Sequence, residues 1–439
     1  MDADPRDPRG LRLSRSPPGR SSRRRGVRGR RPASRGRLAT TRSGRSGPSG
    51  RLSRPPPAVL RPTTKVEAQS AAPPATVVKR AQTGSLVVMH AADVEGFRAQ
   101  AEQAPSPEAL ASIAGQFPRL LEHLVERGES ARSIGALLSS LGETTTRRLL
   151  VLAEDDLGRP PVAYAFIVAG SLARGEQIAG SDQDNGMILD DAYDPDRHGV
   201  YFSRLAERVC DGLAECGYAY CPGDIMASNP RWRQPLSVWL TRFGRWIDRP
   251  DPSALMHSSI FFDLHCVSGQ QSLLQRLRAE ILSRTRKNRR FQGHLAASAL
   301  QFQPALAWHG GLRFRRGKDR QRSLDLKKFG VTPVVDLARV HALAGGHAAV
   351  GTRDRLGRMR EEGTLSVDQF DHLGEAFETI SQLRVEHQAR RIRSGDPPDY
   401  LVRRSELSTR QQRRLRSSLR VVRDAQKRMS RRFGSELFQ

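Results

Sequence analysis

The sequence predicts an α+β fold in which a small mixed α/β domain lies between two helical regions. Three observations support this prediction. Apolar residues recur at three- and four-residue steps between residues 93 and 157, which indicates helices. Short apolar runs alternate with helical stretches over residues 162–268, which is typical of a small sheet covered by helices. From residue 271 onward the pattern is helical to the end of the chain.

Four regions follow from these changes in pattern. We expect a disordered tail over residues 1–85, a helical segment over 86–158, the mixed α/β domain over 159–270 and a helical region over 271–439. The first helical region ends at a Gly-Arg-Pro-Pro sequence, residues 158–161, which breaks a helix. The fold therefore places one small sheet between two sets of helices.

The N-terminal tail is strongly basic. Residues 1–64 contain eighteen arginines, no lysine and three acids, so they carry +15 of the net charge of +27. They are rich in Gly, Pro and Ser and nearly lack large apolar side chains, so they cannot bury a core. One alternative is an arm that binds nucleic acid non-specifically; the other is a solvated tail or a misassigned translation start. We favour the second, because a charge run without aromatic residues offers no platform for stacking bases.

Composition also restricts the class of protein. No apolar stretch follows the basic residues, as a secretory signal would require, and no run is long enough to span a bilayer. The cysteines lack paired Cys-x-x-Cys spacing, which disfavours a zinc site or a disulfide framework. They are Cys210, Cys216, Cys221 and Cys266. We expect a cytoplasmic protein without membrane contact.

Two local patterns outside the central motif allow specific predictions. Ser106 before Pro107 and Glu108 predicts the start of a helix. Tryptophans recur at seven-residue intervals in an arginine-bearing segment, where they either stack a nucleobase or mark a buried helix face. They are Trp232, Trp239 and Trp246. We favour the buried face, which is the commoner meaning of that spacing.

The most informative motif is a small-residue turn followed by two aspartates. An apolar run over residues 164–169 ends in Gly170 and Ser171, whose backbone N–H groups and hydroxyl can approach a triphosphate. Asp182 and Asp184 precede a second apolar run, and residues two apart in a strand share a face. Two converging carboxylates can hold Mg²⁺, which prefers oxygen ligands. Together these features predict a site for metal-dependent nucleotidyl transfer.

Residues 169–189 resemble the nucleotidyltransferase signature of the polymerase-β-like superfamily. More narrowly, they resemble the domain related to the PII-protein uridylyltransferases, which in bacteria often follows cyclic-nucleotide-binding and CBS modules. The family pattern is approximately Gly-Ser-x-x-Arg-x-Glu-Gln followed by Asp-Gln-Asp-Asn. This chain supplies it with Gly170, Ser171, Arg174, Glu176, Gln177, Asp182, Gln183, Asp184 and Asn185. The match is long and specific.

The resemblance implies roles for several of these positions. Gly170 and Ser171 are expected to hold the phosphates, and Arg174 to neutralise charge that develops on them. Asn185 is expected to orient the loop or a metal-bound water. Glu176 and Gln177 are expected to brace the turn rather than to touch substrate.

The superfamily also requires a third carboxylate from a later strand. The candidate is Asp263, inside the apolar run Ser-Ile-Phe-Phe-Asp-Leu-His-Cys-Val at residues 259–267. A carboxylate in such a run is costly to bury unless it is paired or bound to metal. We favour a metal ligand over the alternative, an aspartate held in a salt bridge. Asp224, in a second family-like segment, remains open as a loop residue, a turn former or a substrate contact.

The helical C-terminal region continues the resemblance. Residues 325–339 and 383–388 resemble the substrate-binding domain that follows the transferase in this family. Lys327 and Lys328 are candidates to reach a phosphate, but adjacent helical positions point in different directions, so only one can face the cleft. We assign Lys327 to the nucleotide-binding set. Polar residues inside the bundle are expected to form a network: Arg339, Arg384 and His387.

These features predict in-line attack of an acceptor hydroxyl on the α-phosphate of an NTP, UTP or ATP, with release of pyrophosphate. Asp182, Asp184 and Asp263 are expected to hold two Mg²⁺ ions. The resemblance implies a protein acceptor of the PII type and a signalling role, with regulatory modules absent from this chain. Alternatives are a nucleic-acid-binding or RNA-modifying protein, a non-catalytic nucleotide sensor, and transfer to a small molecule.

Overall fold

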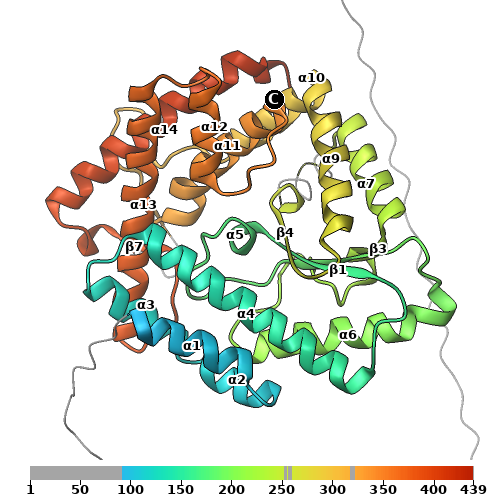
Figure 1. Ribbon diagram of the computed structural model, residues 1–439. Helices are drawn as coiled ribbons and strands as arrows, with labels where there is room; N and C mark the ends of the chain where they lie inside the picture. Colours follow the sequence, from blue (N-terminus) through green and yellow to red (C-terminus); the bar gives the residue numbers. More distant parts are fainter. Residues whose placement is uncertain (1–90, 252–254, 256–259, 317–321, 439) are drawn as a thin grey trace, which may run out of the picture. The chain divides into compact units, whose positions relative to one another are not determined.

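The computed structural model describes residues 91–438, apart from residues 252–254, 256–259 and 317–321 (Figure 1). The expectation of a disordered basic tail falls on residues outside this described part. The prediction of an α+β fold with a small mixed sheet and C-terminal helices is confirmed.

In the described part of the chain, four helices come before the sheet: α1 (Ala91–Gln103), α2 (Pro107–Ala114), α3 (Phe117–Glu126) and α4 (Ala131–Leu157). The predicted start at Ser106 is observed, because its side chain caps α2 by accepting a hydrogen bond from the backbone N–H of Ala109. Ser130 caps α4 in the same way. These caps supply hydrogen-bond partners that the helix interior cannot provide.

The central sheet has four strands in the order β3-β2-β1-β4. The strands are β1 (Tyr164–Ala169), β2 (Asn185–Leu189), β3 (Arg233–Pro235) and β4 (Leu264–Gly269). β1 pairs antiparallel with both β2 and β4, whereas β2 pairs parallel with β3. Every residue of β1 and β2 is buried, so both faces of the sheet are covered.

Helices from three parts of the chain cover this sheet. α5 (Gly170–Ala173) directly follows β1, and α6 (Pro195–Glu215) packs against α4. α7 (Leu236–Asp248) contacts β2 and β3, and α9 (Gln271–Lys287) contacts β1, β2 and β4. The turn that follows β1 contacts α4 and β4, and its residues are only partly buried.

The three tryptophans lie in the core, as we favoured, but only two of them are on one helix. Trp239 and Trp246 belong to α7, whereas Trp232 lies in the 3-10 turn η1 (Pro230–Trp232). All three are buried, and their rings pack around Phe261. This cluster is part of the hydrophobic core rather than a surface for stacking bases.

The C-terminal region is built mainly of helices. They are α10 (Arg289–Ala299), η2 (Lys327–Val331), α11 (Thr332–Gly345), α12 (Thr352–Glu361), α13 (Val367–Arg393), η3 (Arg404–Glu406), α14 (Thr409–Phe433) and η4 (Ser435–Phe438). α13 packs along α14 and also contacts α3, α4 and η2. Two ion pairs join α13 to α3, because Arg393 contacts both Glu122 and Glu126. α13 thereby connects the first and last helical regions.

A second, three-stranded sheet corrects the expectation that this region is helical throughout. It consists of β5 (Arg315–Arg316), β6 (Arg322–Asp325) and β7 (Leu401–Arg403) in the order β5-β6-β7. The strands are two to four residues long and rich in arginine, so no alternation of apolar and polar residues reveals them. β6 leads directly toward η2 and so positions the first residues of that turn.

Candidate active site

A glycine turn closes β1 and brings its backbone close to the two aspartates. Gly170 has φ of 63°, a conformation that residues with a Cβ adopt only rarely. A Cβ on this residue would lie 3.0 Å from Oδ2 of Asp184. Glycine therefore allows both the turn and the close approach of the Asp184 carboxylate.

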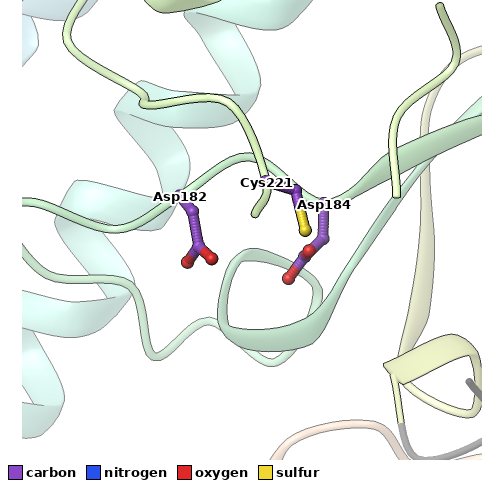
Figure 2. A group of neighbouring side chains, drawn as sticks. All are labelled: Asp182, Asp184 and Cys221. Carbon is purple, nitrogen blue, oxygen red and sulfur yellow. The ribbon is translucent and has the colours of Figure 1, made fainter. Parts of the chain in front are cut away.

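Asp182 and Asp184 lie on the segment that enters β2. The backbone N–H of Ala169 donates to the carbonyl of Asp184 at 2.9 Å, which fixes this segment beside the end of β1. Figure 2 shows both carboxylates on the same side of the segment, with the Cys221 thiol beside Asp184. One ligand atom from each of these three residues lies within 4.8 Å of the other two. The predicted convergence of the two carboxylates is therefore observed.

The electrostatics of this cluster favour a cation. Burial, together with the neighbouring charge of Asp182, raises the pKa of Asp184 to about 6. Burial also raises the pKa of the Cys221 thiol to about 11, so the sulfur keeps its proton at neutral pH and can donate to Asp184. Carboxylate oxygens suit Mg²⁺, whereas a protonated thiol is a poor ligand for it. The oxygen pair fits a hard divalent ion, and Cys221 is better placed as a hydrogen-bond donor.

One lysine of the C-terminal region reaches the cluster. Lys327 Nζ lies 3.9 Å from Oδ1 of Asp182 and above the ring of Tyr400. Lys328 instead lies near the rings of Phe302 and Phe329. As expected for adjacent helical positions, only one of the two lysines faces the aspartates.

The family-like residues around the turn form a second, separate cluster. Arg174 pairs with Glu176 and with Asp263, each at 2.8 Å. Glu176 also accepts a hydrogen bond from the backbone N–H of Thr352 at 2.9 Å. The backbone N–H of Gln177 donates to the Ser139 hydroxyl. These contacts agree with the expected bracing role of Glu176 and Gln177.

Asn185 is also held by the protein itself. It is 1% exposed, and its side-chain amide donates to Gln183 while its carbonyl oxygen accepts from the backbone N–H of Ala227. These bonds tie the aspartate loop to the segment that follows Asp224. Of the two roles considered for Asn185, the geometry favours orienting the loop.

The structure does not bring Asp263 into the Asp182–Asp184 cluster. Its carboxylate is fully buried and contacts three guanidinium groups, those of Arg174, Arg339 and Arg355. Burial raises its pKa, but the three positive charges outweigh burial and hold the pKa well below the usual range. This geometry matches the alternative of an aspartate held by salt bridges.

Asp263 directly precedes β4, and the register of that strand fits the separation. β4 pairs Leu264, and not Asp263, with Ala169, the β1 residue whose N–H bonds to Asp184. Successive residues of a strand point to opposite faces, so a one-residue difference in register changes the side on which a side chain lies. The apolar run around Asp263 does not reveal this register. Arg355 was missed by the sequence analysis, and no local pattern distinguishes it from other arginines.

Comparison with known proteins defines the class to which this fold and site belong. Residues 115–253 match the family model described as "Putative nucleotidyltransferase DUF294", and residues 289–433 match "Putative nucleotidyltransferase substrate binding domain". The chain belongs to this nucleotidyltransferase family, with the transferase domain followed by its C-terminal substrate-binding domain.

Curated relatives add a second finding. Over 95 residues, 22% of this chain, the sequence is 38% identical to a bifunctional uridylyltransferase/uridylyl-removing enzyme of Burkholderia vietnamiensis. It is 36% identical, also over 95 residues, to the enzyme of the same name from Burkholderia lata. The matched segment spans 11% of the length of each relative.

None of the helices in the described residues has the length and apolar character that a membrane span requires.

Proposed function

We propose that this protein transfers a nucleoside monophosphate from an NTP to an acceptor hydroxyl in a Mg²⁺-dependent reaction, with a protein as the acceptor. The observation that carries the proposal is the convergence of the Asp182 and Asp184 carboxylates beside the Gly170 turn. Family membership supports the transferase class. The partial similarity to uridylyltransferases supports a protein acceptor of the PII type and a signalling role.

Each residue has a distinct part in this proposal. Asp182 and Asp184 would hold the metal, and Ser171 would lie next to the phosphates at the glycine turn. Lys327 would contribute positive charge from the substrate-binding domain. When bound, Mg²⁺ would neutralise phosphate charge and lower the pKa of the acceptor hydroxyl. We assign Asp263 as a positioning residue that holds Arg174 beside the turn. In this proposal Asp263 does not bind a second metal ion.

The test is transfer of label from each α-labelled NTP, with Mg²⁺, to protein in a host-cell lysate. We expect a labelled protein band with the wild-type chain and loss of at least about 100-fold with Asp182→Ala or Asp184→Ala, because each removes a ligand of the reacting centre. Asp155→Ala is the matched control, since Asp155 is an exposed aspartate on α4 outside the cluster. The labelled NTP identifies the base, UTP or ATP.

The other outcomes separate the alternatives. Label found in RNA or in small molecules, dependent on both aspartates, would reject the protein acceptor and retain the chemistry. Label in no fraction would favour a non-catalytic nucleotide sensor. Label that persists in both aspartate variants would reject the proposed site itself.

A further inference from the structure

We propose that the protein binds a small phosphate-bearing anion in a second pocket, lined by the Gly175–Glu176 turn and by residues of α4, α12 and α13. This pocket has a volume of about 200 Å³. Asp182 and Asp184 do not line it. Figure 1 shows that α4 comes from a part of the chain far from α12 and α13, which follow one another. The pocket is a candidate regulatory site next to the turn that carries the transferase motif.

The strongest evidence is a buried arginine that makes no ion pair with any described residue. Arg384, on α13, lines the pocket and is 7% exposed. Its Nη2 donates to the carbonyl of Glu176 at 3.4 Å, and its Nε has no hydrogen-bond partner among the described residues. A buried charge that lacks an opposite charge is costly, so a site of this kind favours an incoming anion.

A second unpaired donor lines the same pocket. Thr352, the first residue of α12, is fully buried, and its hydroxyl has no partner within the described part of the chain. Its backbone N–H is already bonded to Glu176. The hydroxyl is therefore free to donate to a ligand.

The charged residues that line the pocket carry one net positive charge. Four arginines and three acids line it: Arg132, Arg174, Arg353, Arg384, Glu176, Asp354 and Glu378. Glu176 is bound by Arg174, and Glu378 lies 3.6 Å from Arg353. A guanidinium group and a hydroxyl together suit the several oxygens of a phosphate group.

Two sources could supply the phosphate group. One is a separate phosphorylated small molecule. The other is the triphosphate of the nucleotide substrate, because Arg174 lines this pocket and its backbone N–H donates to the carbonyl of Gly170, in the turn proposed to hold the triphosphate. In either case the ligand would act on the transferase through the turn, since Arg174 joins Glu176 to Asp263.

The test measures thermal unfolding of the full chain in metal-free buffer, with inorganic phosphate or with sodium chloride at equal ionic strength. Without metal, the aspartate cluster offers phosphate no bridging ion. We expect phosphate to raise the Tm of the wild-type chain by about 2 °C or more, since a ligand that binds only the folded state stabilises it.

Three variants make the test specific. Arg384→Met should abolish the phosphate-dependent shift, and Thr352→Val should reduce it. Without phosphate, neither should lower the Tm appreciably, because each removes a buried polar group that lacks a full set of partners. Arg358→Met is the matched control: Arg358 is an exposed arginine of α12 that does not line the pocket, and the shift should persist.

Either of two results would overturn the proposal: no shift in the wild-type chain, or an undiminished shift in both pocket variants. Thr352→Val keeps the test decisive if Arg384→Met does not fold. Measuring nucleotide binding by the wild type and by Arg384→Met in the presence of Mg²⁺ distinguishes a separate phosphorylated ligand from the triphosphate of the substrate. Equal binding by wild type and Arg384→Met indicates a separate ligand, whereas weaker binding by Arg384→Met indicates the substrate's own triphosphate.

Discussion

At the scale of single residues, the aspartates of this protein divide into two kinds. Asp182 and Asp184 lie near each other with few positive partners, and such a pair gains stability from a cation. Asp263 is surrounded by three guanidinium groups and already has full compensation. The carboxylates of Asp182 and Asp184 are therefore available to bind a cation, whereas the carboxylate of Asp263 is used to stabilise the fold.

This division predicts opposite effects on stability. Asp263→Asn should lower the free energy of unfolding by about 3–5 kcal/mol, because it leaves buried arginines without their counter-charge. Asp184→Asn should change it by less than about 1 kcal/mol, or raise it, because it removes repulsion with Asp182. Urea denaturation of the two variants measures both effects. If Asp263→Asn kept full stability but lost activity, this result would support a role of Asp263 as a metal ligand.

A buried histidine predicts how stability depends on pH. Burial, followed by the nearby charge of Arg432, lowers the pKa of His341 to about 3. The folded state thus holds the neutral form, while the unfolded chain binds a proton below a pH of about 6.5. Stability from this group is complete above that pH and is lost as the pH falls toward 3, by at most about 1.4 kcal/mol per pH unit. His341→Gln should flatten this slope in urea titrations at pH 4 to 7.

If the dependence of stability on pH is unchanged in His341→Gln, the loss of stability in acid comes from other groups. His341 lies on α11 with its ring against Phe433, and it is not part of the aspartate cluster. Its effect should therefore be seen in stability and not in the affinity for nucleotide.

At the scale of elements, the short turn η2 connects the helical C-terminal domain to the aspartates. β6 ends at Asp325, whose carboxylate accepts a hydrogen bond from the backbone N–H of Lys328. The backbone N–H of Leu326 donates to the backbone carbonyl of Tyr400, which anchors the start of η2 next to β7. This arrangement directs Lys327 toward Asp182.

The two adjacent lysines provide a matched pair for testing this arrangement. Lys327→Gln should raise the KM for NTP about tenfold, because it removes one charge-assisted contact to phosphate. Lys328→Gln should change the KM less than about twofold, since Lys328 is exposed and lies against aromatic rings away from the aspartates. Steady-state kinetics of both variants measure the difference. Equal effects would mean that general positive charge, and not position, matters.

At the scale of the whole molecule, positive charge and the transferase motif lie in different parts of the chain. More than half of the net charge lies within residues 1–64, whereas the aspartates and the glycine turn lie in the matched transferase domain. A basic segment of this kind binds nucleic acid in a salt-dependent and sequence-independent manner. The nucleic-acid hypothesis and the transferase hypothesis can therefore be tested separately.

Deletion of residues 1–64 makes this separation measurable. The shortened chain should lose any salt-sensitive binding of a mixed-sequence duplex while it keeps transfer of label from NTP. Binding at 50 and 200 mM salt, together with the label-transfer assay, tests both parts. Loss of both properties on deletion would contradict the assignment of transfer to the central and C-terminal domains.

The sequence by itself determined the features that depend on neighbouring residues. The glycine turn, the spacing of Asp182 and Asp184, the helix start at Ser106 and the α+β class follow from local patterns. Such patterns are short-range: strand and helix periods, and the conformational freedom of glycine, act over a few residues. This is why the sequence could predict that the two carboxylates converge, whereas their role in binding metal stays a prediction.

Only the tertiary structure decided which distant residues meet. Asp263 lies 89 residues from Arg174 and 76 from Arg339 in the sequence, and their contact depends on strand register and on how α11 packs. The pairing of Lys327 with Asp182, and an Arg384 Nε without a hydrogen-bond partner among the described residues, are likewise set by packing between domains. Charge alone does not show whether a partner lies within reach, because that depends on side chains brought together from separate elements.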